Sequence, residues 1–293
     1  MDAGKLSKDP DELLTLHRKI RQQLPTTWSA FFARFGSLRP VQLATIPEIL
    51  KGGNVLITAP TAGGKTEAVA APLCELLKAR RWEGLSIVLV TPTRALVNDL
   101  YHRLERPCQE VGIRLGRKTS DHALPKGAGG QFVITTPESL ESLLTFDRER
   151  LARLRALVID EVHLLDGSPR GDQLRFVMRR LEAYLRHKQG EGDYSLQRVA
   201  LSATVASPEG TAAAYLGEGS RVVSILGQRE IESRTILVEA DEETRAREAM
   251  LAVESFPDVR KVLIFVNSRR QADLAGLSTI RLRGDVPVGR RCR

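Results

Sequence analysis

Residues 54–66, with the sequence N-V-L-I-T-A-P-T-A-G-G-K-T, place a short apolar run directly before a glycine-bearing loop. The run Val55–Thr58 has the length of a buried β-strand, and the stretch from Glu67 to Arg81 is mostly helix-forming. A strand that passes through a glycine loop into a helix is the opening of a βαβ unit. This feature therefore predicts an α/β fold built on a parallel sheet.

The same loop has the composition of a phosphate-binding loop. It matches G-x-x-x-x-G-K-[ST] at Gly64, Lys65 and Thr66, although its first position is Ala59. A phosphate chain needs backbone N–H donors on one concave surface, a cation for its terminal oxygens and a hydroxyl for magnesium. The helix that follows would direct the positive end of its dipole at the anion. A plain turn between strand and helix is the alternative. The predicted nucleotide-binding residues of the loop are Ala59, Pro60, Thr61, Ala62, Gly63, Gly64, Lys65 and Thr66.

The rest of the chain repeats the strand and helix pattern. Strands that alternate with helical stretches predict a parallel sheet covered by helices on both faces. Before this region, residues 9–24 form a predicted surface helix, with Pro10 in its first turn and leucines at helical spacing. The further predicted strands are Ser86–Thr91, Phe132–Thr135, Ala156–Ile159 and Arg198–Leu201. The predicted organisation is an N-terminal accessory over residues 1–25, a main domain over 26–225, a linker over 226–241 and an incomplete second domain over 242–293.

Composition narrows the class of protein. The 293 residues are 42% hydrophobic, with no apolar run near the roughly 20 residues of a membrane span and no apolar secretory stretch at the start. We expect an intracellular, cytoplasmic protein. Cys74, Cys108 and Cys292 lie far apart in the sequence, so neither a disulfide framework nor a zinc site is predicted. The net charge of +8 suits a nucleic-acid partner only weakly, because half of the excess lies in the last 13 residues.

Two adjacent carboxylates, Asp160 and Glu161, follow the buried run Ala156–Ile159. They fall at the sheet edge where ligands of parallel sheets bind. Asp160 is predicted to hold magnesium, directly or through water, opposite Thr66, and Glu161 to orient and deprotonate an attacking water. In isolation such a pair is more simply a helix N-cap. Its position 95 residues after Lys65 favours the second half of a nucleotide site.

Further short motifs lie in a fixed order around the loop and the carboxylates. They are R-P-V-Q ending at Gln42, T-P-T-R-A-L over 91–96, T-P-E-S-L over 136–140, D-E-V-H over 160–163 and S-A-T over 202–204. In this order they resemble the first motor domain of a superfamily 2 helicase of the DEAD/DEAH-box kind. That family commonly opens its loop with alanine, as Ala59 does here. The D-E-V-H motif with Arg170-Gly171 is similar to the large helicase-related and RNA-exosome-associated branches, and the loop is similar to that of a helicase lobe attached to CRISPR nucleases.

The resemblance covers about residues 26–225 and implies a RecA-like P-loop domain, ATP and Mg²⁺ as cofactors, and single-stranded DNA or RNA as partner. It implies that Gln42 reads the adenine edge and that Lys65 and Glu161 are catalytic. It assigns the grip on strand phosphates to Pro92, Thr93, Arg94, Thr136 and Pro137, and the coupling of hydrolysis to the domain interface to His163, Ser202 and Thr204.

The pattern stops early in the second domain. Residues 261–270 resemble its opening strand and helix, but the chain ends 23 residues later without a Q-x-x-G-R-x-G-R-like motif. Arginine fingers of such motifs contribute on the order of 10³ to 10⁵ in rate. We therefore expect weak ATP–Mg binding and slow hydrolysis unless a second chain or a missing C-terminal half supplies them. Two alternatives stay open: a non-catalytic nucleic-acid-binding scaffold, and another P-loop ATPase or kinase.

Overall fold

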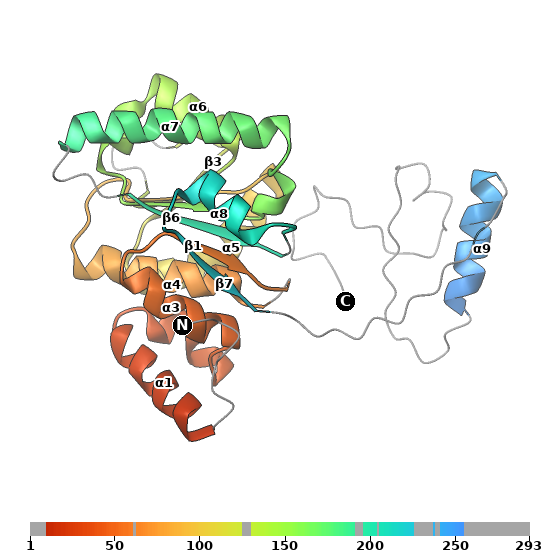
Figure 1. Ribbon diagram of the computed structural model, residues 1–293, viewed down its shortest axis with the longest axis horizontal. Helices are drawn as coiled ribbons and strands as arrows, with labels where there is room; N and C mark the ends of the chain where they lie inside the picture. Colours follow the sequence, from red (N-terminus) through yellow and green to blue (C-terminus); the bar gives the residue numbers. More distant parts are fainter. Residues whose placement is uncertain are drawn as a thin grey trace. The chain divides into compact units, whose positions relative to one another are not determined.

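A seven-stranded, all-parallel sheet forms the centre of the first of two units, residues 1–227, in a computed structural model of the chain (Figure 1). The structure describes residues 10–60, 63–124, 130–190, 196–203, 205–225, 237 and 241–254. The strand order is β3-β4-β2-β5-β6-β1-β7. The strands are β1 (Val55–Thr58), β2 (Ile87–Val90), β3 (Leu115–Lys118), β4 (Phe132–Thr135), β5 (Ala156–Ile159), β6 (Gln197–Ser202) and β7 (Arg221–Ser224).

Helices cover both faces of this sheet, as predicted (Figure 1). Alternate strand residues point to opposite layers, so that Val55 and Ile57 join one core and Leu56 the other. The first layer holds α1 (Pro10–Gln23), α2 (Trp28–Phe32), α3 (Pro40–Leu50), α4 (Lys65–Ala79) and α5 (Arg94–Glu110). The second holds α6 (Pro137–Phe146), α7 (Pro169–Gln189) and α8 (Pro208–Leu216). Short 3₁₀ turns lie at η2 (Ala33–Phe35), η3 (Arg148–Arg153) and η4 (Val162–Leu164).

The five predicted strands are all present. Three have the predicted bounds, and the strands β2 and β6 differ from the prediction by one residue at each end. The sequence prediction missed β3 and β7, which are the two edges of the sheet. All four residues of β3 are only half-buried, and in β7 only Val223 is buried. Edge strands lack the continuous apolar run that identifies a central parallel strand, because only one side of them pairs with a neighbour.

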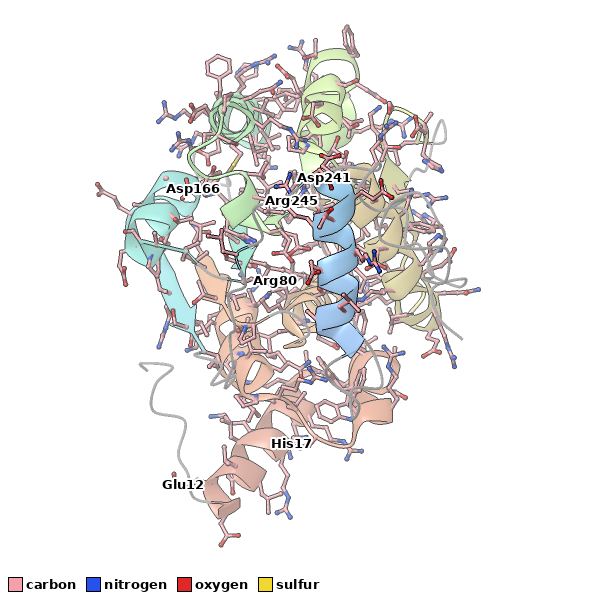
Figure 2. The ribbon with its side chains drawn as sticks, turned by 90° about the vertical axis from the view of Figure 1, so that its right-hand side faces the viewer. Glu12, His17, Arg80, Asp166, Asp241 and Arg245 are labelled. Atoms are coloured by element: carbon pink, nitrogen blue, oxygen red, sulfur yellow. The ribbon has the colours of Figure 1, made fainter. Side chains whose placement is uncertain are left out.

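The predicted N-terminal helix is α1, which begins at Pro10 and packs onto the body of the unit. Ile20 and Leu24 are fully buried there. His17, labelled on this helix in Figure 2, meets the Trp28 ring edge-on at a centroid distance of 5.2 Å. Burial lowers the pKa of His17. The predicted capping residue Asp9 lies outside the described residues.

Glu75 ties the N-terminal segment to α4. Its Oε2 accepts hydrogen bonds from the backbone N–H groups of Thr26 and Thr27 at 3.0 and 2.9 Å, and from the Thr27 hydroxyl at 3.0 Å. Glu75 and Thr27 are both buried. A buried carboxylate is tolerated where donors replace its water shell, and three donors do so here.

Cys74 and Cys108 are neighbours in space, which their spacing in the sequence did not predict. Both are fully buried free thiols, one on α4 and the other on α5. A hydrogen bond between the two thiols, together with burial, raises the pKa of Cys74 well above its usual value. The pair is part of the apolar contact between these helices. Cys292 lies outside the described residues.

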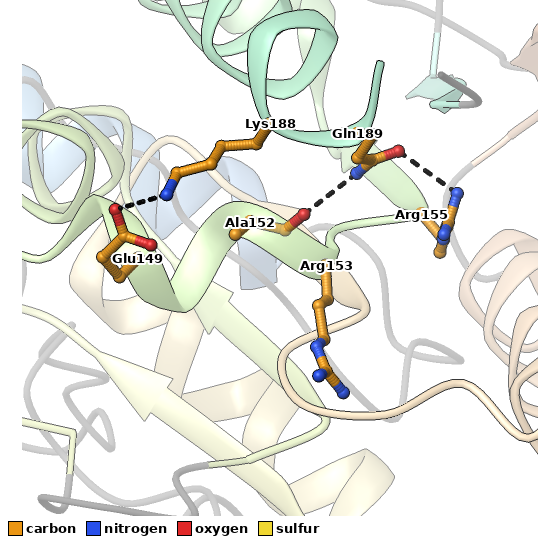
Figure 3. A pocket seen from close by; sticks show the side chains of 6 residues that line it. All are labelled: Glu149, Ala152, Arg153, Arg155, Lys188 and Gln189. Atoms are coloured by element: carbon orange, nitrogen blue, oxygen red, sulfur yellow. Dashed lines mark hydrogen bonds and ion pairs between the residues drawn. The ribbon is translucent and has the colours of Figure 1, made fainter. Parts of the chain in front are cut away.

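A hollow of about 560 Å³ lies where the C-terminal end of α7 meets η3 and the residues before β5 (Figure 3). Its polar groups largely bind one another. Lys188 Nζ lies 3.1 Å from Glu149 Oε1, and the Gln189 amide donates to Ala152 O at 3.0 Å and accepts from Arg155 at 3.2 Å. These contacts hold the end of α7 against η3.

The second unit, residues 228–293, is described mainly at α9 (Glu242–Glu254). Asp241 caps this helix by accepting a hydrogen bond from Thr244 N at 2.8 Å, and this bond lowers the pKa of Asp241 (Figure 2). Most of the predicted linker, and residues 261–270 with the basic tail, lie outside the described residues. Among the residues that are described, no helix is long and apolar enough to cross a membrane.

Glu75→Ala is expected to lower the free energy of unfolding by on the order of 2–4 kcal/mol, because it leaves two buried donors of Thr27 and the partly buried N–H of Thr26 without an acceptor. Urea denaturation followed by circular dichroism measures this. Glu110→Ala, at an exposed ion pair on α5, is the control and should change stability by less than about 0.5 kcal/mol. Equal effects of the two substitutions would show that Glu75 does not anchor the N-terminal segment.

Candidate nucleotide and strand sites

The predicted site residues gather at one edge of the sheet. The loop after β1, the segments after β2 and β4, the carboxylates after β5 and the serine that ends β6 all lie at carboxyl ends of parallel strands. Strand β6 lies between β1 and β5, so their carboxyl ends are two strands apart. Parallel pairing thus brings together residues as far apart in the sequence as Ala59 and Ser202, 143 positions.

In the predicted phosphate-binding loop, the lysine side chain donates hydrogen bonds to backbone carbonyls of the loop itself. Lys65 Nζ donates to Ala59 O at 2.6 Å and to Pro60 O at 3.2 Å. Gly64 has φ +84°, a left-handed conformation that favours glycine. At Gly63 a Cβ atom would lie 2.9 Å from Pro60 O, so this position also needs glycine. Thr61 and Ala62 lie outside the described residues.

Gln42 lies against this loop instead of facing solvent. Its amide nitrogen donates to Gly64 O at 3.3 Å and its amide oxygen accepts from Arg39 N at 2.9 Å. The side chain is buried at the N-terminus of α3. An amide has two N–H donors and two acceptor lone pairs, so one of each stays available for an adenine edge. That role stays a prediction.

Asp160 is buried with 6% of its surface exposed. Burial, followed by repulsion from the Glu161 carboxylate, raises the pKa of Asp160 to about 7, while the Lys65 ammonium opposes this shift. The same carboxylates act on the lysine: burial lowers the pKa of Lys65, and Glu161 and Asp160 partly offset that. The D-E pair therefore lies near enough to favour the charged form of Lys65, which is the proximity that the nucleotide-site prediction expects.

Glu161 has a strained backbone at φ +48°, which non-glycine residues rarely adopt. Its buried Oε2 accepts no hydrogen bond from the part of the chain that the structure describes. His163 Nδ1 lies 3.4 Å from this oxygen, and also 3.2 Å from Ser202 Oγ. Backbone strain and an unsatisfied buried oxygen are typical of functional sites. Thr204, the third predicted coupling residue, lies outside the described residues.

A groove of about 390 Å³ lies beside the nucleotide residues. Thr93 Oγ1 caps α5 by accepting from Leu96 N at 3.2 Å, and Thr136 Oγ1 caps α6 by accepting from Ser139 N at 3.4 Å. Pro137 is the buried first residue of α6. The groove is lined by Pro92, Thr93, Arg94, Ser120, Thr136, Glu138, Ser139 and Arg170. It thus includes four of the five predicted strand-binding residues.

Arg94 already has partners in this groove. Its Nη1 lies 2.7 and 3.0 Å from the two carboxylate oxygens of Asp121 and 3.1 Å from Ser120 Oγ. Ser120 and Asp121 follow strand β3, which the sequence did not predict, so these two residues were not among the predicted site residues.

Arg170 also lines the groove but was not among the predicted site residues, because its only use in the sequence was as a feature of the helicase branch. The available signal was the position of Arg170, ten residues after Asp160 in the first turn of a predicted helix.

Comparison with known proteins identifies the family. The DEAD/DEAH box helicase profile matches residues 39–211. This chain belongs to the DEAD/DEAH box helicase family. ATP-dependent helicase Lhr-Core of Sulfolobus acidocaldarius is 29% identical across 93% of the chain, which covers 33% of that relative. Lhr helicase/uracil glycosylase of Escherichia coli K12 is 31% identical across 69% of the chain and 14% of its own length.

A solved structure agrees with this DEAD/DEAH box assignment. Mycobacterium smegmatis helicase Lhr, bound to ssDNA and AMP-PNP, has a TM-score of 0.68 at 26% identity over 85% of this chain and 34% of its own chain. DEAD-box helicase Mss116, bound to ssRNA and UDP-BeF, has a similar fold, with a TM-score of 0.62 at 18% identity over 86% of this chain and 53% of its own chain. The chain spans about a seventh to a third of the curated relatives named above.

Asp160→Asn is expected to stabilise the free protein at high pH. The pKa of Asp160 is about 7 in the folded protein, against a usual 3.8. The stability that the protonated Asp160 carboxyl contributes is therefore fully present below about pH 4 and is lost as the pH rises through 7. Thermal unfolding at pH 8 should show a Tm several degrees above wild type, and the difference should shrink towards pH 5. Asp172→Asn, at a largely exposed ion pair, is the control. Parallel pH profiles for wild type and Asp160→Asn would contradict the raised pKa.

Proposed function

We propose that residues 26–225 bind ATP with Mg²⁺ and a single strand of nucleic acid, as the first motor domain of an ATP-dependent superfamily 2 helicase. One observation carries this proposal: the buried Lys65 lies within electrostatic reach of Asp160 and Glu161, 95 residues further along the chain. A lysine that binds phosphate next to a carboxylate that holds the metal ion is the minimal arrangement of a P-loop nucleotide site. Family membership and the AMP-PNP bound to the similar Lhr structure support it.

The residues present fit a magnesium ion. Mg²⁺ prefers oxygen ligands and keeps several waters beside one or two protein groups and the substrate phosphates. Thr66 Oγ1 and the Asp160 carboxylate would hold it, and both side chains are buried at the same sheet edge. Burial raises the pKa of Asp160, and a bound cation would favour its charged form. When bound, the ion would neutralise charge on the phosphate oxygens.

The chain's own groups account for the remaining roles. Lys65 would exchange its bonds to Ala59 O and Pro60 O for phosphate oxygens when nucleotide enters the loop. Glu161 has a buried oxygen without a hydrogen bond from the described residues, and this oxygen would accept one from the attacking water. His163, between Glu161 and Ser202, would report the state of that site to the segment after β6.

The groove would hold the strand through its phosphates. The N-termini of α5 and α6 would supply positive dipole ends, and Arg94 would supply a guanidinium. Such contacts bind without reading base sequence. The ssDNA and ssRNA bound in the similar helicase structures support a single-stranded ligand.

A non-catalytic scaffold is the second candidate function. Arginine fingers contribute on the order of 10³ to 10⁵ in rate to phosphoryl transfer, so binding without rapid hydrolysis is a distinct outcome. A chain that only binds strands would do so independently of nucleotide chemistry.

Binding and turnover distinguish the two functions. A fluorescent ATP analogue with Mg²⁺ should bind the wild-type chain. Its affinity for Lys65→Ala should be at least tenfold lower, because the ammonium group that would bind the phosphates is removed. Lys51→Ala, at an exposed pair with Glu48, is the control and should bind as wild type. Steady-state hydrolysis should be slow with or without a strand. Strand binding without any nucleotide binding by wild type would favour the scaffold, and strong strand-stimulated hydrolysis would contradict the expected dependence on a second domain.

Arg94→Ala should weaken binding of a labelled single strand about threefold to tenfold. It should also lower the salt slope, which is the slope of log affinity against log salt concentration, by about one, the contribution of one phosphate contact. Asp121→Asn should strengthen binding, because it releases the guanidinium from its carboxylate partner. Fluorescence anisotropy at several salt concentrations measures both. Arg106→Ala, near the other end of α5 and 85% exposed, is the control. An effect of Arg94→Ala no larger than that of Arg106→Ala would remove Arg94 from the strand site.

A further inference from the structure

The segment between Asp160 and Arg170 is a short connection that is held by local backbone hydrogen bonds. Leu165 N and Asp166 N both donate to Val162 O, at 2.9 and 2.8 Å, and Ser168 N donates to Leu165 O at 3.0 Å. The side chains of Val162 and Leu165 are fully buried. Ten residues therefore fix the start of α7 relative to the metal carboxylate.

Gly171 makes this fixation tight. A Cβ atom at this position would lie 2.0 Å from Leu165 O and 2.6 Å from the Tyr215 hydroxyl, so the first turn of α7 packs directly on the connection. Ser168 caps α7 by accepting from Gly171 N at 3.2 Å while donating to Leu165 O at 2.6 Å. Asp166, labelled in Figure 2, accepts a hydrogen bond from Thr211 of α8 at 2.7 Å. The start of α7 is thus held from several sides.

Arg170 stands on this turn and reaches two other strand ends. Its Nη2 donates to Pro92 O at 2.8 Å, and its Nε donates to Glu138 Oε1 at 2.8 Å. Pro92 immediately precedes the cap of α5, and Glu138 lies in the first turn of α6. One guanidinium therefore joins the segments that follow β2, β4 and β5, and all three meet in the groove.

Stability alone gives a weak reason for this arrangement. Arg170 and Glu138 are 45% and 49% exposed, and exposed ion pairs contribute about 0–1 kcal/mol. The guanidinium fork, however, fixes direction as well as distance, which a flexible ammonium does not. Its bond to a backbone carbonyl sets where the N-terminus of α5 lies relative to that of α6.

We propose that Arg170 is a positioning residue for the strand groove, which holds the phosphate-binding ends of α5 and α6 at the spacing that a single strand requires. This inference rests on the proposed function and adds a residue to it. Arg170 acts through Pro92 and Glu138, whereas Arg94 would bind a phosphate itself. The two arginines therefore differ in how salt changes the effect of removing them.

Anisotropy of a labelled single-stranded oligonucleotide tests this with four variants of the whole chain. Arg170→Ala should weaken binding about tenfold with an unchanged salt slope, because no phosphate contact is removed. Arg170→Lys should restore little, and Glu138→Gln should give an intermediate loss. Arg180→Ala is the control, since Arg180 joins α7 to α6 through Glu141 at 3.6 Å outside the groove lining. The Mg–ATP analogue should bind Arg170→Ala as tightly as wild type.

Equal strand affinity of Arg170→Ala and Arg180→Ala would overturn the inference while the proposed function stands. So would a salt slope that falls by about one in Arg170→Ala, because Arg170 would then be a direct phosphate contact. Full rescue by Arg170→Lys would also overturn it, because charge alone would then suffice. If wild type binds no strand, the proposed function fails and this inference fails with it. Where Arg170→Ala does not fold, the Arg170→Lys and Glu138→Gln results decide.

Discussion

The nearness of Lys65 to Asp160 and Glu161 at one sheet edge is the constraint on which the rest of the first unit depends. Burial works against the charged forms of both Lys65 and Asp160 in this site. The sheet keeps them together because β6 pairs with both β1 and β5, so their carboxyl ends share one edge. A metal ion and a phosphate chain are the ligands that would neutralise this arrangement.

The same edge explains why the second site lies beside the first. The strands β2 and β4 continue the sheet on the far side of β5, and their following helices begin at Thr93 and Thr136 caps. The proposed nucleotide and strand sites are thus built from one set of strand ends. The short connection from Asp160 to Arg170 gives them a common framework, with Gly171 as its closest packing point.

Much of this could be predicted from the sequence, for a physical reason. Central parallel strands are buried on both faces, so five appeared as apolar runs, and the glycine loop and D-E pair marked their own chemistry. The edges β3 and β7 lacked that signal. The partners Asp121 for Arg94 and Pro92 for Arg170 come from strand order, which local patterns do not determine. The contact of Cys74 with Cys108 was missed for the same reason.

A crystal structure of the chain with Mn²⁺ and AMP-PNP tests most directly whether Lys65 and the D-E pair form one nucleotide site. We expect an anomalous manganese signal between Thr66 Oγ1 and the Asp160 carboxylate, at ligand distances of about 2.0–2.3 Å. We also expect Lys65 Nζ to have left Ala59 O for a phosphate oxygen. Nucleotide bound away from the loop, or manganese without contact to Asp160, would contradict the site described here.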